Sequence, residues 1–573
     1  MKKFIFVLAF TALTSPLFSQ WSTDPAVNNV VSDAGGQSVV ATCIDGAGGV
    51  IVTWMENYKI KVQRVNSFGQ NLWTTNGVLL SSPAKNSVFP SITSDGAGGA
   101  IIVWLSYAQN QPYNLYAQRV RSDGVLMWDS AVTVNAVPSY GYNLDEIEII
   151  GAEAGGCIIG WTGGQPNTGF LFVQKLDAYG NRVWDSNDVQ ISFGTTFSAD
   201  MCKDGKNGVF IVYNGVGPNS GEFFAQHVNS FGDTLWNANS EIVNAQGQQM
   251  HPVMCEDQNY GFIVAWEDYR NFSSSHLCEI YAMRIDSNGN NLWNSNGNLI
   301  VSIPNVNLSI ISCISDAHGG AHIVWVDPSY AHVFLWGEGI VGQNIDYNGQ
   351  KRWGTNGVVL AGDVDFFITS GNRYSPKVSS VDALGGLIIA WVGYSGPGPG
   401  LIDRIFATFA QKIDYYGVIQ WDSLGTLVAT EGFYSSLSMV PDGGSGGINI
   451  AWCGAKNNGS TKIYAQHVKS NSTLGNRPGA IPLGLIKSPE LKQNYPNPFN
   501  PVTKISFAIP FAQFISLKIY DMTGREVVTL ADGVYDMGEH AVTWNASNFS
   551  TGIYFYKLTA NERTEVKKMM LIK

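Results

Sequence analysis

The residues best suited to acid–base chemistry are a few carboxylates near the starts of predicted strands. Asp145, Glu146 and Asp200 hold such positions, and His251 lies near the start of a later strand. Two carboxylates at a defined separation can cleave a glycosidic bond. The chain carries no HExxH, GxSxG, phosphate-binding loop or EF-hand pattern. A polysaccharide hydrolase or lyase is therefore the enzyme class these residues suggest, unless they face elsewhere.

Metal-binding patterns are weaker. His318 and His322 flank a predicted turn instead of sharing one helix face, which makes a zinc site improbable. The recurring Asp-x-x-Gly turns lack the dense oxygen series of a calcium loop, and hairpin turn chemistry explains them. We predict no metal and no cofactor.

Aromatic residues in irregular segments are the best candidates for ligand contact. Exposed aromatic rings beside carboxylates suit carbohydrate or protein surfaces, and the alternative is that each ring packs its own loop. Glu267, Asp268 and Arg270 fit a local ion pair better than a site. The five predicted ligand-binding residues are Trp336, Tyr330, Phe366, Phe367 and Tyr374.

Composition limits the scaffold that could carry these residues. Only 14% of the 573 residues are charged, and the chain holds 63 Gly and 17 Trp. Its 34 basic and 45 acidic residues give a net charge of −11, so no basic surface suggests nucleic-acid binding. These features favour a turn-rich, all-β protein.

The N-terminus reads as a signal peptide over residues 1–19. Lys2 and Lys3 precede an apolar run from Phe4 to Leu13, which is too short to span a bilayer. The mature protein is therefore expected to be exported.

A repeat organises residues 20–470. Each copy combines Asp-Gly-x-Gly-Gly, an apolar run with a first aromatic anchor, a strand with Gln, and an Asp-x-x-Gly turn with a second anchor. The first anchors are Trp54, Trp104, Trp161, Tyr213, Trp266, Trp325, Trp391 and Trp452. The second anchors are Trp73, Trp128, Trp184, Trp236, Trp293, Trp353 and Trp421.

The missing eighth second anchor is found at the other end of the mature chain, at Trp21. A blade shared between the two chain ends closes a ring of four-stranded units. We therefore predict an eight-bladed β-propeller whose N-terminal strand completes the last blade; seven blades plus a degenerate unit is the alternative. The loops after the second and fourth strands vary in length, so the face they share is the expected functional face.

Three repeated features have structural interpretations. The recurrent Gln, as at Gln63, is expected to satisfy backbone groups between blades. His227 and His467 stand where other copies carry Arg or Lys, so we expect exposed strand residues. The seven cysteines are interpreted as free core thiols rather than disulfides.

After a Pro/Gly/Ser linker at 471–488, residues 489–573 contain short alternating segments typical of a small Ig-like β-sandwich. Its distinctive motif residues are Pro496, Asn497, Pro498, Phe499, Gly524, Gly552, Tyr554, Lys567 and Lys568. In these residues the segment resembles the type A C-terminal sorting domain of the type IX secretion system. The resemblance implies passage across the outer membrane, type IX machinery as partner, a secreted or outer-surface location, and in the family frequent cleavage with attachment to surface lipopolysaccharide.

Two functions follow. The first is a non-catalytic surface protein whose propeller binds glycans or proteins. The second is a secreted polysaccharide hydrolase or lyase with its active site at the propeller axis, which requires several carboxylates to converge there. The fold hosts many functions, and the first function fits the weak enzyme patterns better.

Overall fold

The computed structural model is all-β; the residues that it describes include two short 3-10 helices, Glu153–Gly155 (η1) and Pro328–Tyr330 (η2). It divides into two compact units, residues 1–382 with 386–477, and residues 478–573 with 383–385. The structure describes residues 21–573 except for 109–110, 137–146, 164–168, 193, 216–221, 238–239, 273–276, 331–336, 366–376, 381–384, 396–404, 422–424, 431–433, 444–445, 456–459, 475–489, 510–512, 536–537 and 561–562. The predicted signal peptide lies outside the described residues.

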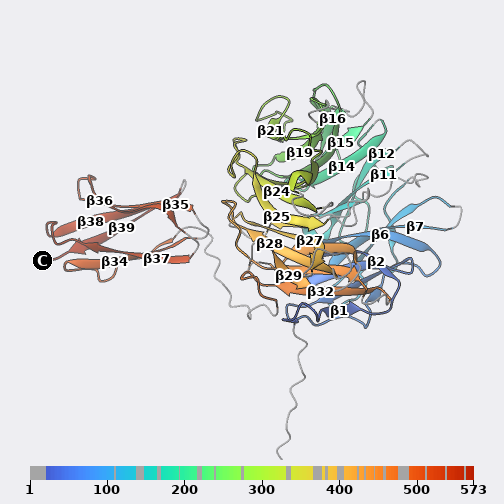
Figure 1. Cartoon of the computed structure of the whole chain (residues 1–573), viewed down its shortest axis with the longest axis horizontal. Helices are drawn as coiled ribbons and strands as arrows, with labels where there is room; N and C mark the ends of the chain where they lie inside the picture. The colour runs from blue at the N-terminus through green and yellow to red at the C-terminus, as the bar shows by residue number, and fades with distance from the viewer. Residues whose placement is uncertain are drawn as a thin grey trace, which may run out of the picture. The chain divides into compact units, whose positions relative to one another are not determined.

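The first unit contains eight four-stranded antiparallel sheets in its described part (Figure 1). The first four are β2 (Gln37–Ile44), β3 (Val50–Glu56), β4 (Lys59–Val65) and β5 (Val78–Leu79); β6 (Asn86–Ser94), β7 (Ala100–Tyr107), β8 (Asn114–Val120) and β9 (Val132–Thr133); β10 (Glu148–Gly151), β11 (Cys157–Gly163), β12 (Phe170–Leu176) and β13 (Val189–Gln190); and β14 (Thr196–Lys203), β15 (Val209–Gly215), β16 (Glu222–Val228) and β17 (Ser240–Val243).

The other four sheets follow the same order of strands. They are β18 (Gln249–Glu256), β19 (Phe262–Asp268), β20 (Glu279–Ile285) and β21 (Asn298–Val301); β22 (Ser309–Ser315), β23 (Ala321–Asp327), β24 (Gly337–Ile345) and β25 (Val358–Asp365); β26 (Lys377–Ser380), β27 (Leu387–Ser395), β28 (Ile405–Ile413) and β29 (Thr426–Ala429); and β30 (Tyr434–Pro441), β31 (Ile448–Gly454), β32 (Lys462–Val468) and β1 (Asn29–Ser32).

The last sheet joins the two ends of this unit, because β1 pairs antiparallel with β32, and the two lie side by side in Figure 1. Trp21 is 2% exposed and donates from Nε1 to the carbonyl of Ser67 at 3.0 Å. Other second anchors make the same bond into the next sheet, as Trp73 does with Ser122 at 3.1 Å. Trp21 thus occupies the second-anchor position of the last sheet.

The first strands of the eight sheets contact one another in a closed cycle, β2, β6, β10, β14, β18, β22, β26, β30 and back to β2. Each sheet buries apolar side chains against its neighbours, and the first anchors lie in these shared cores. Face-to-face burial on both sides of each sheet explains why so few residues are charged.

The repeated turn between the first and second strands is set by its aspartate. Asp45 Oδ1 accepts hydrogen bonds from the amides of Ala47 and Gly49 at 2.8 and 2.7 Å. Gly46, between them, has φ +71°, a conformation that favours glycine. The Asp-Gly-x-Gly-Gly pattern is therefore turn chemistry.

The role expected for the recurrent glutamine is wrong in one respect. Gln63 donates to the carbonyl of Thr74 at 2.9 Å and accepts from the amides of Arg64 and Trp73 at 3.0 and 2.9 Å. These groups belong to its own repeat, so the side chain fastens the third strand to the following turn within one repeat instead of bridging two sheets.

The exposure expected for His227 and His467 is also wrong. His467 is 1% exposed, and its Nε2 lies 3.1 Å from Asp442 Oδ2. His227 Nε2 lies 3.0 Å from Asp204 Oδ2. Arg64 holds the same place beside Asp45, so each histidine is the partner of a buried turn aspartate, which is why it is buried.

All seven cysteines are buried, and none forms a disulfide, as the sequence indicated. The nearest pair joins two neighbouring first strands, with Cys255 Sγ 3.5 Å from Cys313 Sγ.

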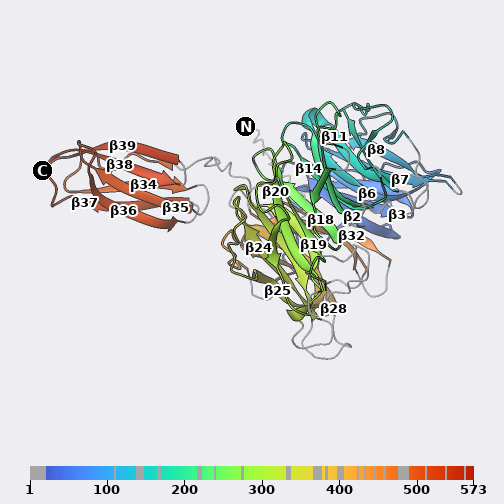
Figure 2. The same cartoon turned by 90° about the horizontal axis from the view of Figure 1, so that it is seen from above.

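The second unit has two sheets around one core (Figure 2). One contains β33 (Glu490–Leu491), β34 (Val502–Ile509) and β37 (Gly538–Asn545), and the other contains β36 (Glu526–Tyr535), β35 (Gln513–Tyr520), β38 (Gly552–Ala560) and β39 (Arg563–Leu571). Trp544, one of the two tryptophans outside the repeat, is buried in this core.

Candidate functional site

Eight equivalent residues, one on each first strand, lie at the same height in the closed cycle of first strands. Each pairs with the second-strand residue that immediately precedes the first anchor, and each is partly exposed. We call this set the inner ring. In cyclic order it consists of Ala41, Ser91, Glu148, Asp200, Val253, Ser312, Lys377 and Ser438.

Three members of the inner ring carry charge. Glu148 and Asp200 are neighbours, on β10 and β14, and Lys377 lies on β26. The remaining members are small or aliphatic and uncharged. The inner ring is therefore acidic on one arc and basic on another.

The two acids line the same pocket. Asp200 also accepts from the amides of Met201 and Met254, at 2.8 and 2.7 Å. Burial raises the pKa of Asp200 to about 6, although these amides and Glu148 favour its charged form. The carboxylate thereby links β10, β14 and β18.

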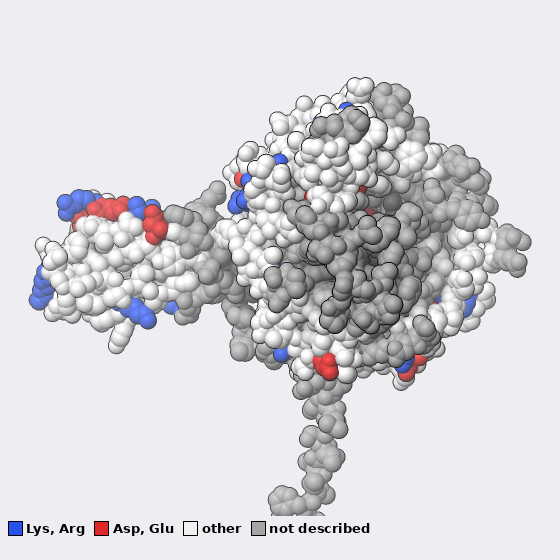
Figure 3. Space-filling model, in the orientation of Figure 1, with Lys and Arg blue, Asp and Glu red and all other residues white. Residues whose placement is uncertain are grey.

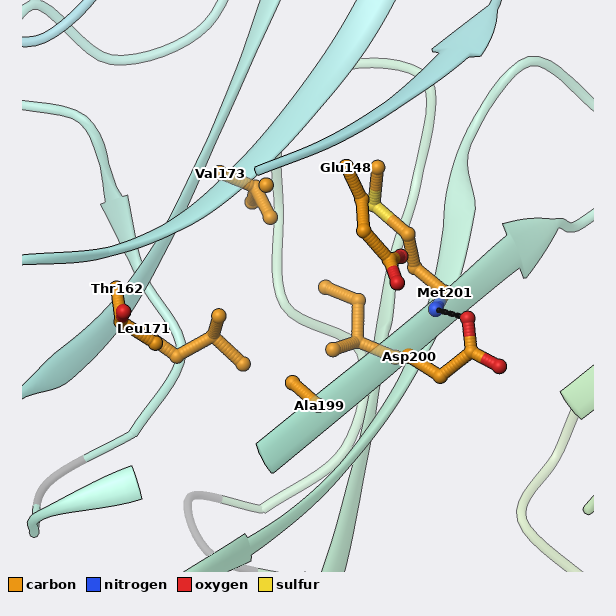
Figure 4. A pocket seen from close by; sticks show the side chains of 9 residues that line it. Glu148, Thr162, Leu171, Val173, Ala199, Asp200 and Met201 are labelled. Carbon is orange, nitrogen blue, oxygen red and sulfur yellow. Dashed lines mark hydrogen bonds between the residues drawn. The ribbon is translucent and has the colours of Figure 1, made fainter. Parts of the chain in front are cut away.

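A pocket lies beside this acid pair, between the sheets that contain β10 and β14 (Figure 4). Its empty volume is about 290 Å³, part of it open to solvent, and Thr162, Leu171 and Val173 form its apolar side. Gly160 lines it, at the position where other sheets carry Thr53, Val103 or Ala265. A Cβ there would lie 3.1 Å from Met201 Sδ.

Lys377 is the third charged member. Burial lowers the pKa of its ammonium, and no hydrogen bond or ion pair joins it to any residue that the structure describes.

Before the inner ring, six of the eight first strands carry a β-bulge. Val39, Phe89 and His251 adopt φ of 49°, 52° and 51° there, values that are strained for L-residues and often found at functional sites. Phe197 occupies the bulge of β14 and is 53% exposed. The bulges lie toward the face with the variable loops.

His251 is held by a buried carboxylate. Its Nδ1 lies 3.0 Å from Glu267 Oε2, and the imidazole side chain is 56% exposed. Glu267 Oε1 accepts from the amide of Ile310 at 3.0 Å. Arg270 pairs with Asp268 at 2.6 Å, which is the local ion pair that the sequence suggested, with Glu267 serving His251 instead.

Most sequence-predicted site residues cannot be placed. Trp336, Phe366, Phe367 and Tyr374, with Asp145 and Glu146, lie outside the described residues, and Tyr330 ends η2 with its side chain undescribed. Asp200 and His251 do reach the first strands. Glu148 and Lys377 were missed: Glu148 precedes a turn in which Ala152 replaces the usual aspartate, so the repeat could not be aligned there.

The histidine pair has separate roles. His318 Nδ1 lies 2.7 Å from the carbonyl of Asp316, while the buried His322 ring packs 5.0 Å from Trp353. Within the described ranges, no group of three or more metal-ligating side chains occurs. No helix of that part of the chain is long and apolar enough to cross a membrane.

In the second unit, the sorting motif fastens the final strand. Phe499 is buried, with its ring 5.4 Å from Trp544, and its amide donates to the carbonyl of Met570 at 3.0 Å. Asn497 Oδ1 accepts from the amide of Met570 at 2.9 Å. Tyr554 donates to the carbonyl of Ser550 at 2.8 Å. Lys567 and Lys568 lie on β39, the strand thus held.

Residues 493–573 match the family of secretion system C-terminal sorting domains. This unit is the sorting domain of the type IX secretion system, and the chain is its cargo, delivered to the outer cell surface or the extracellular space. No curated protein matches the chain.

Several solved structures resemble the fold at low identity. An ulvan lyase of family PL25 bound to -[GlcA(1-4)Rha3S]- is 10% identical with TM-score 0.40, covering 69% of this chain and 93% of that one. PorZ, a surface component of the type IX system of Porphyromonas gingivalis, is 11% identical with TM-score 0.25, covering 91% and 74%. The Dos1 propeller is 8% identical with TM-score 0.37, covering 77% and 95%. These likenesses carry no information about ligand or activity.

Proposed function

We propose that the first unit is a closed eight-bladed β-propeller, spanning residues 20–470, and that the sorting domain is an Ig-like β-sandwich joined to it by the linker 471–488. Eight four-stranded sheets, the cyclic contacts of their first strands, and the pairing of β1 with β32 support the ring. Two sheets around one core support the sandwich.

The propeller binds an extracellular glycan or protein without cleaving it. The observation that carries this proposal is the state of the acid pair: Glu148 and Asp200 line one pocket, and Asp200 already accepts hydrogen bonds from two backbone amides. Glycosidase carboxyls stand about 5–5.5 or 6.5–9.5 Å apart, with the sugar or a water between them. Asp200 is instead fastened to two backbone amides, so its carboxylate is already committed within the fold.

We propose ligand contact in two places, the bulged first strands and the loops of the variable face. The bulged strands offer Phe197 and His251 around the centre of the ring, where an aromatic ring can stack on a sugar or side chain. The loop aromatics Trp336, Tyr330, Phe366, Phe367 and Tyr374 remain proposed contacts on the variable face. Figure 3 shows broad uncharged areas on the described part of the larger unit.

Binding is tested by applying the purified full chain to arrays of glycans and surface proteins. We expect retention of a defined ligand, weakened by Phe197→Ala and by Trp336→Ala. Tyr179→Ala is the matched control, because Tyr179 is an aromatic residue 77% exposed on a turn after the third strand. Arrays that retain nothing, or retention weakened equally by Tyr179→Ala, would contradict the proposal.

One observation favours the alternative, a polysaccharide hydrolase or lyase at the propeller axis. The pKa of Asp200, raised by burial to about 6, would suit a general acid. Cleavage of a retained polysaccharide, lost in Asp200→Asn, would establish it.

We also propose that the protein is attached to the cell surface after export. The passenger is expected to be joined to surface lipopolysaccharide after export, with the sorting domain removed. Recovered surface protein would then run above the passenger mass and lack peptides from residues 489–573.

A further inference from the structure

The four-stranded sheet of the sorting domain has one face in the core and one at the surface (Figure 2). Side chains alternate along its strands. Leu517 on β35, Leu558 on β38 and Met569 on β39 are buried in the core, and the residues of the alternate rows are partly or fully exposed. We call these alternate rows the outer face. It includes Lys518, Phe555, Lys557, Val566, Lys568 and Met570.

Strand pairing gathers the three lysines of the outer face. Lys518 lies directly opposite Lys557 in the register of β35 and β38. Lys568 lies opposite Phe555 in the register of β38 and β39. Residues directly opposite have Cβ atoms about 4.5–5.5 Å apart, and like charges there are destabilising. The sheet therefore holds positive charges close together at a cost to its own stability.

The acids of the described part of this sheet leave its β38–β39 side basic. Lys518 Nζ lies 3.0 Å from Glu526 Oε2 on the edge strand β36. β38 contains no acidic residue. Glu565 belongs to the other row of β39, and its Oε2 accepts from the amide of Leu491 at 2.9 Å. The charge of the outer face on β38 and β39 is thus available to an acidic partner.

Apolar side chains lie among the lysines. Val566, directly opposite Lys557, is 56% exposed, and Met570 is 42% exposed. The Phe555 ring, on the neighbouring strand, is half-buried. Exposed apolar residues that gather on one face, with charged residues around them, are typical of protein interaction sites.

The other sheet of the sorting domain has a different outer row. That row contains Val502, Lys504 and Ser506 on β34, and Ala541, Thr543 and Asn545 on β37. These six side chains include one lysine and no aromatic ring. The combination of clustered positive charge and apolar area is therefore a property of the four-stranded sheet, and the other sheet supplies matched controls.

We propose that the outer face is the surface by which the sorting domain docks on the type IX machinery, and that its partner there is a protein surface with carboxylates around an apolar patch. The lysines pair with the carboxylates, and Phe555, Val566 and Met570 pack on the patch. A lipopolysaccharide phosphate would pair with the lysines but leave these apolar side chains in water. The proposal concerns export and is independent of the ligand of the first unit.

The test expresses the full chain in a bacterium with a type IX system and measures the surface-delivered fraction by protease shaving of intact cells. Lys557→Glu replaces a like-charged cross-strand pair by an opposite-charged one, so the melting temperature should not fall. In the docked state the same change sets a carboxylate against a carboxylate. We expect the surface fraction to fall roughly tenfold or more, with the chain held in the periplasm.

Val566→Ser tests the apolar part of the outer face independently. Its side chain is mostly exposed, so folding should be unaffected, and the loss of apolar burial on docking should lower the surface fraction roughly threefold or more. Lys504→Glu and Val502→Ser make the same chemical changes on the outer row of the other sheet, where Val502 is 40% exposed. Both controls should be delivered as wild type.

Surface delivery unchanged in Lys557→Glu and Val566→Ser, or lowered equally by the two controls, overturns the docking face. Vesicles containing lipopolysaccharide distinguish a lipid partner from a protein. If the purified full chain binds them, and Lys557→Glu abolishes that binding while surface delivery stays at the wild-type level, the outer face binds an anionic lipid and the proposed protein partner is wrong.

Discussion

At the scale of single residues, the chain places few charges in its interior and gives nearly all of them a partner. Turn aspartates pair with an arginine or a histidine. Asp95, for example, forms an ion pair with Arg119 at 3.0 Å. Glu267 takes His251. Asp200 instead accepts from the backbone amides of Met201 and Met254. It lies in the inner ring beside the pocket that Glu148 also lines.

Asp200 should make stability depend on pH in a defined direction. Its folded-state pKa of about 6 lies above the ordinary value of 3.8. The stability that it contributes is therefore fully present below about pH 3.8 and is lost as pH rises through about 6. The free energy of unfolding of wild type, relative to Asp200→Asn, should fall between pH 4 and 7 in chemical denaturation.

Asp123→Asn is the control for this titration. Asp123 is exposed, and its pKa is lowered, first by the amide of Val125, so any pH-dependent difference should be small and of opposite sign. A constant difference between wild type and Asp200→Asn from pH 4 to 7 would contradict the account of the acid pair.

The cysteines give a second residue-scale prediction. Burial raises the pKa of Cys157 to about 12, and all seven thiols are buried, so a thiol reagent at pH 8 should label none in the native protein. In denaturant without reductant it should label seven. A count of five would mean that two are joined, and Cys255 with Cys313 would be the pair to examine.

At the scale of elements, the N-terminal strand, with only four residues, has a large effect on the closure of the ring. β1 completes the sheet of β30, β31 and β32, and Trp21 fills the second-anchor position that the eighth repeat lacks. Without them the last sheet would present an unpaired edge. The closure therefore depends on a segment some 400 residues away in the sequence from its partners.

Trp21→Ala should lower the free energy of unfolding of the full chain by about 3–5 kcal/mol, as for other large buried side chains. Val27→Ala, in the same segment but with a side chain 57% exposed, should change it by about 0.5 kcal/mol or less. Equal denaturation midpoints for the two variants would refute a structural role of the N-terminal segment in closing the ring.

At the scale of the whole molecule, the sequence predicted the repeated sheets well because turn chemistry and anchor spacing are local and recur. The pairing of β1 with β32 was predictable from a count, eight first anchors against seven second anchors. The inner ring was not predicted from the sequence. Its members stand at nearly constant distances from the following turn, four residues for Asp200 before Asp204 and five for Lys377 before Asp382, but that they lie at one level follows only from the strand pairing. Side-chain partners of His467 and Gln63 likewise depend on three-dimensional packing.

Because the chain divides into two units, removing the sorting domain should block export and leave the first unit folded. A chain ending at residue 477 retains the whole first unit but lacks the sorting domain. It should accumulate in the periplasm, with melting behaviour of the first unit unchanged. Surface delivery of this truncated chain, measured by protease shaving of intact cells, would mean that the address lies elsewhere.

The central claim is that the propeller binds an extracellular glycan or protein without cleaving it. The most direct measurement incubates the full chain with the polymer it retains, between pH 5 and 8, and follows polymer length, new reducing ends and absorbance of unsaturated uronates. The account predicts stable retention with polymer length unchanged at every pH. Shortening of the polymer by wild type, abolished in Asp200→Asn, would contradict it.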